Sequence, residues 1–389
     1  MKTKTKTTWR KVKLGEVADI KMGQSPRSEF YNSRGEGLPF YQGVTDFGEK
    51  YPKKSIYCSQ PTKIAEAGDV FFSVRAPVGN VNVAIEKSCI GRGVAALRMK
   101  NGNNDFLYFF LKNYERYFKN ISGGTTYESI NKDQIEDIEL SIPEDPNEQK
   151  RIADVLSAFD EKIELNNKIN QTLEQMAQAI FKEWFVSPSI ALAEEDKLPK
   201  GWRVGKLGEL MVARKEKFRK YEEWKNLKLL DLGRFPQKSL AITSYGKGEE
   251  IKTAGIGFKK GDVLFGAVRP YFHKVVIAPF DGVTNSSVFV ITPKKESSYA
   301  FLVTVLFSEN TVNYASMSAS GTKMPVIKWE DLCDMEVLIP EERAIENFNK
   351  TVKNFYNLII KNTLENQKLA SLRDLLLPKL MSGEILVKS

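Results

Sequence analysis

The 389-residue sequence has very little histidine and cysteine and no long apolar run. His273 is the single histidine, which excludes catalytic or metal-binding clusters built from several histidines. The three cysteines lie far apart and form no Cys-x-x-Cys pair, so neither a disulfide framework nor a zinc site is indicated. No stretch of about 18 apolar residues occurs, and the first residues lead into polar sequence without an apolar signal core. These absences predict a reduced, soluble, cytoplasmic protein.

Motifs of nucleotide-dependent enzymes are missing as well. The string Gly321-Thr322-Lys323 does not fit a P-loop, and no GxGxxG follows a predicted strand. Leu38-Pro39-Phe40-Tyr41 lacks the polar first residue of an amino-methyltransferase loop. Asp145 with Glu148 and Lys150 resembles a magnesium nuclease string, but acidic residues at this place also suit the start of a helix. The sequence therefore predicts a protein without catalysis of its own.

The charge of the chain gives modest support for a polyanionic partner. The formal net charge is +9, but residues 1–13 alone hold six Lys or Arg and no acidic residue. Residues 14–186 are slightly acidic, and the remaining basic excess lies in the second half of the chain. Nucleic-acid binding and an ordinary solvated basic surface both remain open on this ground alone.

An internal repeat organises the sequence. Residues 9–16 (WRKVKLGE) recur at 202–209 (WRVGKLGE), and residues 68–70 (GDV) recur at 261–263, both at an offset of 193. The Gly-Thr pair at 124–125 recurs at 321–322, at an offset of 197. Landmarks that keep their order with so little drift indicate a tandem duplication of a unit about half as long as the chain.

Each copy of the repeat has two parts. Residues 1–147 and 187–341 mix short β-branched runs with Gly/Pro turns and an apolar helical stretch, which predicts an α+β (mixed α/β) domain in each copy. The expected strands include 70–74, 81–85, 263–268 and 288–291. Residues 148–186 contain no Gly or Pro and carry apolar residues at spacings of three and four, as do residues from 342 to about 377 within the C-terminal segment 342–389. These two segments are predicted to be long spacer helices.

The two predicted helices are expected to pair with each other. The seam residues Ile152, Leu156 and Ile163 have counterparts such as Phe348 and Val352 in the second copy. Spacing of this kind is typical of a coiled coil, and two similar halves in series favour antiparallel pairing with pseudo-two-fold symmetry. Polar residues interrupt the seam at equivalent places, which predicts that they fix the helix register. They are Asn166, Asn170, Asn362 and Asn366.

Several polar residues are candidates for contact with DNA. Arg75 and Arg269 occupy corresponding turns after a strand, and Arg92 lies between two glycines, where the backbone can come close to a ligand. Glycine-containing loops supply Thr125, Thr126, Tyr127, Thr322 and Lys323, and a basic cluster supplies Arg214, Lys215, Lys217 and Arg219. For each residue a solvated or fold-stabilising role is equally open. Occurrence in equivalent places of both copies supports the interpretation that these residues contact phosphates or base edges.

Six stretches of the sequence form a family pattern: 68–79 (GDVFFSVRAPVG), 90–93 (IGRG), 124–126 (GTT), 148–153 (EQKRIA), 181–185 (FKEWF) and 372–380 (LRDLLLPKL). With these stretches, the sequence resembles the specificity subunit of type I restriction–modification systems. The resemblance covers essentially the whole chain in the family's order, although the second copy has Glu-Arg-Ala-Ile at 342–345 where the family has Glu-Gln-Lys-Arg.

The resemblance implies a non-catalytic subunit that binds a bipartite duplex DNA target. One half-site would be read by each target-recognition domain, and the coiled coil would set the unread spacer. Double-stranded DNA, two methyltransferase subunits and restriction subunits are the implied partners; S-adenosylmethionine, ATP and Mg²⁺ would belong to those subunits and not to this chain. The alternatives are a stand-alone methyltransferase–endonuclease fusion and a coiled-coil scaffold with two peptide-binding domains.

Overall fold

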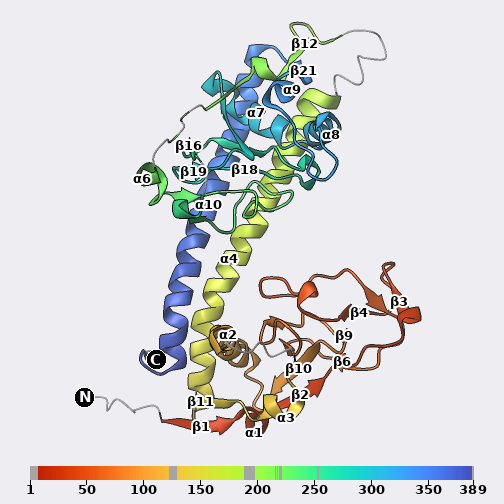
Figure 1. The fold of residues 1–389 in the computed structure, drawn as a ribbon, viewed down its shortest axis with the longest axis vertical. Coiled ribbons are helices and arrows are strands. Elements are labelled where there is room, and N and C mark those ends of the chain that lie inside the picture. Colours follow the sequence, from red (N-terminus) through yellow and green to blue (C-terminus); the bar gives the residue numbers. More distant parts are fainter. Residues whose placement is uncertain are drawn as a thin grey trace. The chain divides into compact units, whose positions relative to one another are not determined.

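The computed structural model describes residues 8–121, 129–187, 198–214, 216, 218, 221–251 and 254–387. The chain divides into two compact units. The first unit contains Met1–Asp160 and Ser371–Ser389, and the second contains Glu161–Ala370. Both units mix strands and helices, as the sequence predicts (Figure 1).

The first unit is built on an antiparallel four-stranded sheet with the order β2-β10-β7-β8. Its strands are β2 (Ala18–Met22), β10 (Val94–Met99), β7 (Val70–Ser73) and β8 (Val81–Val83). All four residues of β7 are buried, because the strand lies inside the sheet with its apolar side chains covered on both faces. Helix α2 (Asn104–Ile121) packs against β7, β8 and β10. Its buried residues include Phe106, Leu107 and Phe110, which belong to the main core of this unit.

Two smaller sheets complete the first unit. Strands β1 (Trp9–Lys13) and β11 (Glu139–Pro143) form an antiparallel pair beside the short helices α1 (Leu14–Val17) and α3 (Lys132–Glu136). The other sheet has the order β3-β5-β4-β9-β6. Its strands β4 and β9 pair parallel, and its other three described pairs are antiparallel. Its strands are β3 (Tyr31–Asn32), β5 (Tyr57–Cys58), β4 (Leu38–Tyr41), β9 (Ser88–Ile90) and β6 (Ile64–Ala65). The 3-10 turn η1 (Ser28–Phe30) directly precedes β3 in the chain, and η2 (Val44–Asp46) lies between β4 and β5.

The second unit repeats this plan, which confirms the predicted duplication. Its four-stranded sheet has the order β13-β20-β17-β18, the same as in the first unit. The strands are β13 (Met211–Ala213), β20 (Val288–Pro293), β17 (Val263–Gly266) and β18 (Val275–Ile277). Strands β12 (Arg203–Lys206) and β21 (Glu336–Ile339) form the antiparallel pair. The remaining sheet contains β15 (Gly246–Lys247), β14 (Lys228–Leu229), β19 (Gly282–Thr284) and β16 (Ile256–Phe258).

The helices of the second unit differ from those of the first in one respect. The place of α2 is taken by two shorter helices, α7 (Tyr299–Leu306) and α8 (Glu309–Ser318). The helical conformation is interrupted between them, and the side chain of Ser308 caps α8 by accepting a hydrogen bond from the Thr311 backbone N–H. The short elements of this unit are α6 (Tyr221–Trp224), α9 (Trp329–Cys333), η4 (Leu207–Glu209), η5 (Gly248–Glu250), η6 (Pro270–Phe272) and η7 (Glu296–Ser298).

Two long helices each contribute residues to both units. Helix α4 (Pro146–Phe181) continues into the π-helical turn η3 (Lys182–Val186), so the predicted helix over 148–186 is confirmed. Helix α10 (Glu342–Met381) passes through Pro378 and ends four residues beyond the predicted 377. No helix among the described residues is long and apolar enough to cross a membrane.

The long helices pair antiparallel, as the order of the chain predicts. Within the second unit, Asn166 contacts Asn366 while Asn170 contacts Asn362, so the residue numbers along α10 fall as those along α4 rise. Phe348 of the expected seam packs against α4, with its ring centroid 6.0 Å from that of Phe181. Phe348 and Val352 also belong to the core of the second unit, which they share with residues of α7.

Candidate nucleic-acid interface

In the first unit, three loops meet where β7 ends. The Val74 backbone N–H donates to Gly93 O at 3.0 Å, and the Ile130 N–H donates to Val74 O at 3.0 Å. Arg75 forms an isolated β-bridge with Ser129. We call this meeting of residues 74–80, 91–93 and 129–130 the first junction. It brings Arg75 close in space to the loop that carries Arg92, although the two residues come from different turns.

The second unit contains the same arrangement. The Ala267 N–H donates to Ser287 O at 2.9 Å, and the Ile327 N–H donates to Ala267 O at 3.1 Å. Val268 forms an isolated bridge with Val326. We call the meeting of residues 267–274, 285–287 and 320–327 the second junction. A shared hydrogen-bond pattern at the end of equivalent strands shows that both junctions are parts of one repeated frame.

Two predicted contact residues of the first junction are available to a ligand. The side chains of Arg75 and Arg92 are exposed, and neither has a side-chain partner among the residues that the structure describes. Exposed guanidinium groups held on a fixed backbone suit both phosphate oxygens and the acceptor edge of guanine.

The glycines beside Arg92 have a packing reason. A Cβ atom at Gly93 would lie 2.2 Å from the backbone oxygen of Gln42. A Cβ atom at Gly91 would be within 3.1 Å of both Phe40 and Ser25. The close approach that the sequence analysis expected at these glycines is therefore made by the chain itself, and only the Arg92 side chain remains free to meet a ligand.

Arg269 lies one residue later in the register than the sequence analysis assumed. Strand pairing aligns Val268 with Arg75, because each forms the bridge to its junction loop. Arg269 follows in a left-handed conformation with φ of 50°, its N–H donates to Pro325 O at 2.7 Å and its Nη2 donates to Lys323 O at 3.1 Å. Thr322 and Lys323 are exposed in the same loop, so the second junction does bring these three predicted residues together.

Arg214 has a partner inside the fold. Its Nε and Nη2 donate to the two carboxylate oxygens of buried Asp262 at 2.6 and 3.0 Å. The side-chain hydrogen bond with Asp262 raises the pKa of Arg214. In the first unit, Arg98 donates to buried Asp69 at 2.5 Å in the same way. The repeated Gly-Asp-Val motif is therefore a structural turn in which each aspartate binds an arginine, and DNA contact by Arg214 stays a prediction.

Some predicted contact residues lie outside the described part of the chain. These are Thr125, Thr126, Tyr127, Lys215, Lys217 and Arg219.

The four asparagines of the helix pair meet in a hydrogen-bonded ladder. Asn166 Nδ2 donates to Asn366 Oδ1 at 2.8 Å, and Asn362 Nδ2 donates to Asn170 Oδ1 at 2.9 Å. The ladder extends to side chains that the sequence analysis did not identify, because Asn166 also donates to Glu365 and accepts from Lys162, and Asn366 donates to Asn167. Asn166, Asn170 and Asn362 are at most 5% exposed. Their role in fixing the register stays a prediction.

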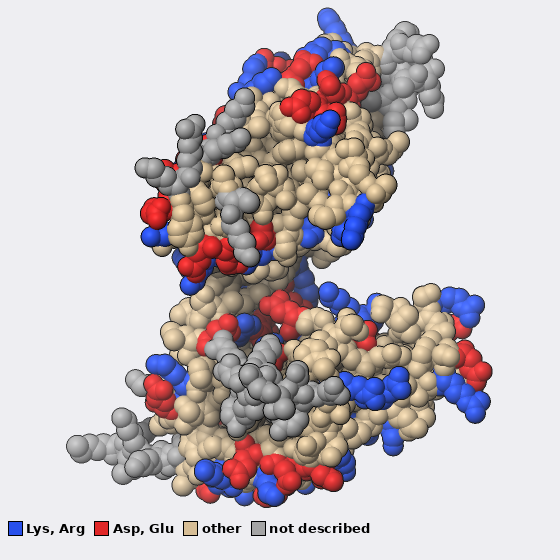
Figure 2. All heavy atoms as spheres, in the orientation of Figure 1, with Lys and Arg blue, Asp and Glu red and all other residues tan. Residues whose placement is uncertain are grey.

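The acidic string at the start of α4 is used within the fold. Glu148 is buried and forms an ion pair with Arg151, and Lys150 pairs with Asp154 one turn later. Within the described ranges, no group of three or more His, Cys, Asp or Glu residues is placed to hold a metal ion. Figure 2 shows lysine and arginine next to aspartate and glutamate in small mixed groups on the surface.

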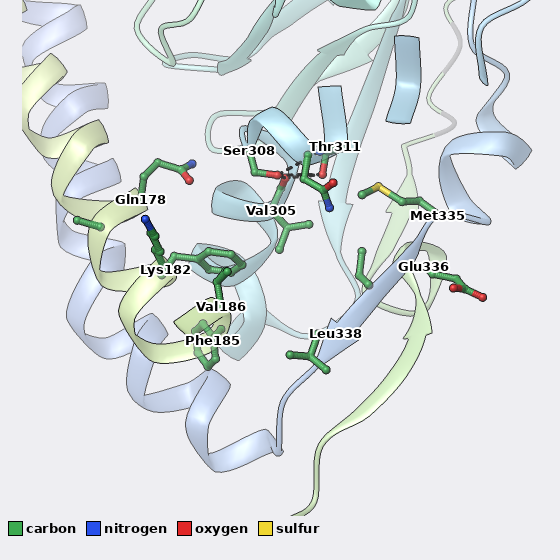
Figure 3. A pocket seen from close by; sticks show the side chains of 14 residues that line it. Gln178, Lys182, Phe185, Val186, Val305, Ser308, Thr311, Met335, Glu336 and Leu338 are labelled. Atoms are coloured by element: carbon green, nitrogen blue, oxygen red, sulfur yellow. Dashed lines mark hydrogen bonds between the residues drawn. The ribbon is translucent and has the colours of Figure 1, made fainter. Parts of the chain in front are cut away.

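A groove of about 600 Å³ in the second unit is mostly apolar. In Figure 3, Phe185 and Val186 from η3 lie on one side and Val305 and Leu338 on the other. The hydroxyl groups of Ser308 and Thr311 both donate to Val305 O near the end of α7, so they stabilise the turn between α7 and α8. The groove therefore presents packing surface and no arrangement of nucleophile and base.

Known proteins resemble this chain along nearly its whole length. The family model described as "Type I restriction modification DNA specificity domain" matches twice, over residues 6–175 and 199–373. The type I restriction enzyme MjaIX specificity subunit of Methanocaldococcus jannaschii is 27% identical over 98% of this chain and 94% of its own length. The putative MjaX specificity subunit of the same organism is 39% identical, but the match spans only 44% of this chain and 41% of that protein.

A solved structure shares the fold. The crystal structure of the type I restriction–modification S subunit from M. genitalium aligns with a TM-score of 0.64 at 18% identity, covering 98% of each chain. The two matches of the family model coincide with the two copies of the repeat.

Proposed function

This chain belongs to the type I restriction–modification DNA specificity family, and from this premise we propose that each of its units reads one half of a bipartite duplex target. It is the sequence-recognition subunit of its complex and carries no catalytic step. The alternative of a methyltransferase–endonuclease fusion has no support, because the specificity-domain model matches both halves of the chain.

The observation that carries the proposal is the repeated junction. Both units join three loops by equivalent backbone hydrogen bonds at the end of the same strand. Exposed Arg75 and Arg92 lie at one junction, and exposed Thr322 and Lys323 lie at the other. Two similar frames with different polar side chains are what independent reading of two half-sites requires.

We propose two methyltransferase subunits and restriction subunits as the protein partners, in the cytoplasm. S-adenosylmethionine would be bound by the methyltransferase subunits, and ATP and Mg²⁺ by the restriction subunits. None of these cofactors is assigned to this chain. Its task is to select the sequence at which the other subunits act.

We expect specific binding to need the methyltransferase partner. Residues 14–186 carry a slight acidic excess, which gives the chain alone little capacity to neutralise phosphates. The isolated chain should therefore bind duplex DNA weakly and lose that binding as salt is raised. Gel-shift titrations at several salt concentrations, with and without the methyltransferase subunit, measure this. Sequence-specific binding in the nanomolar range by the isolated chain at physiological salt would contradict the expectation.

The function itself is tested by the methylated motif. A host that expresses this chain with its methyltransferase subunit should acquire methylation at a motif of two defined halves and an undefined spacer. A host that expresses the methyltransferase subunit alone is the control and should lack this motif. A single uninterrupted motif, or methylation that does not depend on this chain, would overturn the proposal.

A further inference from the structure

The second junction contains an unusual turn. Among the described residues, three that are not glycine have positive φ angles: Lys238 at 54°, Arg269 at 50° and His273 at 50°. Arg269 and His273 flank η6 (Pro270–Phe272) on its two sides. Lys238 is joined to them, because its N–H donates to His273 O at 2.9 Å. Left-handed conformations are strained for residues with a side chain and persist only where the surroundings fix them.

Contacts from three directions fix this turn. His273 is buried, and its Nε2 donates to Phe307 O at 2.9 Å, at the break before α8. At the other end of η6, Arg269 is bound to the backbone of Lys323 and Pro325 in the loop of the second junction. Glu309 at the start of α8 pairs with Lys238 at 2.9 Å. The backbone of the turn is therefore held by both its neighbouring helix and its neighbouring loop.

The side chain at the tip of this fixed turn is free. Tyr271 is 53% exposed, and its hydroxyl group has no hydrogen-bond partner within the described ranges. Its ring lies with the centroid 4.7 Å from that of Phe272, which limits the directions that the side chain can take. The turn thus presents an aromatic ring with one donor and acceptor group beside the loop that carries Thr322 and Lys323.

The first unit lacks this feature although it shares the frame. Strand pairing matches Val70 with Val83 in the first unit and Val263 with Ile277 in the second. The connection between the paired strands is therefore one residue longer in the second unit. None of the described residues of the first junction, other than glycine, has a positive φ. The difference between the two copies lies in the turn, at the place where two readers of unlike half-sites must differ.

We infer that Tyr271 is a base-contacting residue that determines the sequence specificity of the second unit, and that Arg269 is a positioning residue for it. The hydroxyl group matches donors and acceptors on base edges, and the ring suits the methyl group of thymine. An uncharged side chain adds little to non-specific attraction by phosphates, so its contribution is to discrimination. This inference rests on the proposed function of the chain as a reader of duplex DNA.

The test measures discrimination in each half-site separately. The full chain in complex with its methyltransferase subunit is titrated with its cognate duplex and with duplexes that carry single base-pair substitutions. For Tyr271→Ala, we expect discrimination at one or two positions of one half-site to fall on the order of tenfold, with the other half-site unchanged. Arg269→Gly, which accepts the left-handed backbone but removes the bond to Lys323, should weaken discrimination in the same half-site. Tyr245→Ala is the matched control, since Tyr245 is an exposed tyrosine of the same unit outside the junction.

The outcomes separate this inference from the function on which it rests. Equal loss of affinity for cognate and substituted duplexes, unchanged discrimination, or loss in both half-sites would overturn the role of Tyr271. If the wild-type complex itself fails to discriminate in two half-sites, the proposed function is wrong. If Tyr271→Ala fails to assemble with the methyltransferase subunit, Tyr271→Ser gives the same decision, because it also lacks the ring.

Discussion

Arginine side chains in this protein divide between those that hold the fold and those that are available to a ligand. Arg214 and Arg98 each bind a buried aspartate of the repeated Gly-Asp-Val turn. Arg373 pairs with Asp160 at 2.5 Å inside the first unit, with both side chains mostly buried. Arg75 and Arg92 are exposed at the first junction. The same residue type thus serves both purposes, and the partners of each side chain within the fold decide which one.

Glu174 is a buried acid of α4 that binds the second unit's own loop. Its Oε1 accepts hydrogen bonds from the Leu240 N–H at 2.7 Å and from the Ser239 hydroxyl at 3.0 Å. Burial raises the pKa of Glu174 to about 7, although these hydrogen bonds act in the opposite direction. A raised pKa means that the folded protein binds this proton more tightly than the unfolded chain does. The stability contributed by Glu174 is therefore present below about pH 4.5 and is lost as the pH rises through about 7.

We predict that Glu174→Gln reduces the pH dependence of stability. The wild-type protein should lose on the order of 1 kcal/mol of unfolding free energy between pH 6 and pH 8 through this group, and the variant should not. Urea unfolding followed by tryptophan fluorescence measures the change, since four of the five tryptophans belong to the second unit. Glu161→Gln, at an exposed position of the same helix, is the control. An equal pH slope in wild-type protein and Glu174→Gln would contradict the assignment.

At the scale of elements, the helix pair combines apolar packing with a polar ladder. Asn170 and Asn362 share one hydrogen bond, and the Nδ2 atom of Asn170 is buried without a partner. We predict that Asn362→Leu alone destabilises the second unit by about 1–3 kcal/mol, because it removes the one hydrogen-bond partner that the Asn170 amide has among the described residues. The double variant Asn170→Leu with Asn362→Leu should recover this loss, since neither of these two positions then carries a buried amide.

Urea denaturation of the single and double variants checks the ladder. Gln171→Leu is the control, because it adds a leucine at an exposed position next to the ladder and should change the stability little. A double variant less stable than Asn362→Leu would show that the amides stabilise the pair beyond their mutual hydrogen bond.

The sequence predicts the elements better than their contacts. The repeat, both long helices and the strands of the four-stranded sheets follow from offsets and spacing that a single chain displays. Three contacts do not follow from the sequence: the burial of Phe348 in the core with α7, the pairing of Arg214 with Asp262, and the one-residue difference in register between Arg75 and Arg269. Each of these depends on which distant segment lies opposite, and Tyr271 was missed because the backbone that distinguishes it is fixed by tertiary contacts.

At the scale of the whole molecule, we propose that the helix pair sets the length of the spacer in the target. Asn170 faces Asn362, so four residues inserted between Asn170 and Leu173 can be matched by four inserted between Ile359 and Asn362. Each helix then lengthens by about 6 Å, roughly one turn. We predict the same two half-sequences with a spacer longer by one or two base pairs, since each base pair adds about 3.4 Å. An unchanged spacer in an active variant would show that the partner subunits set the spacing.

The most direct test of the account is the methylated motif of a chimera in which residues 9–147 come from another family member. The exchange keeps α10 and keeps α4 from Glu148 onward. Ile152, Leu156 and Leu377 of these helices pack into the core of the first unit, so a donor with similar apolar residues facing them is required. Methylome sequencing of a host that carries the chimera and the methyltransferase subunit measures the outcome. We predict that one half of the motif changes to that of the donor while the other half stays the same. A motif in which both halves change together, or in which neither changes, would contradict the reading of one half-site by each unit.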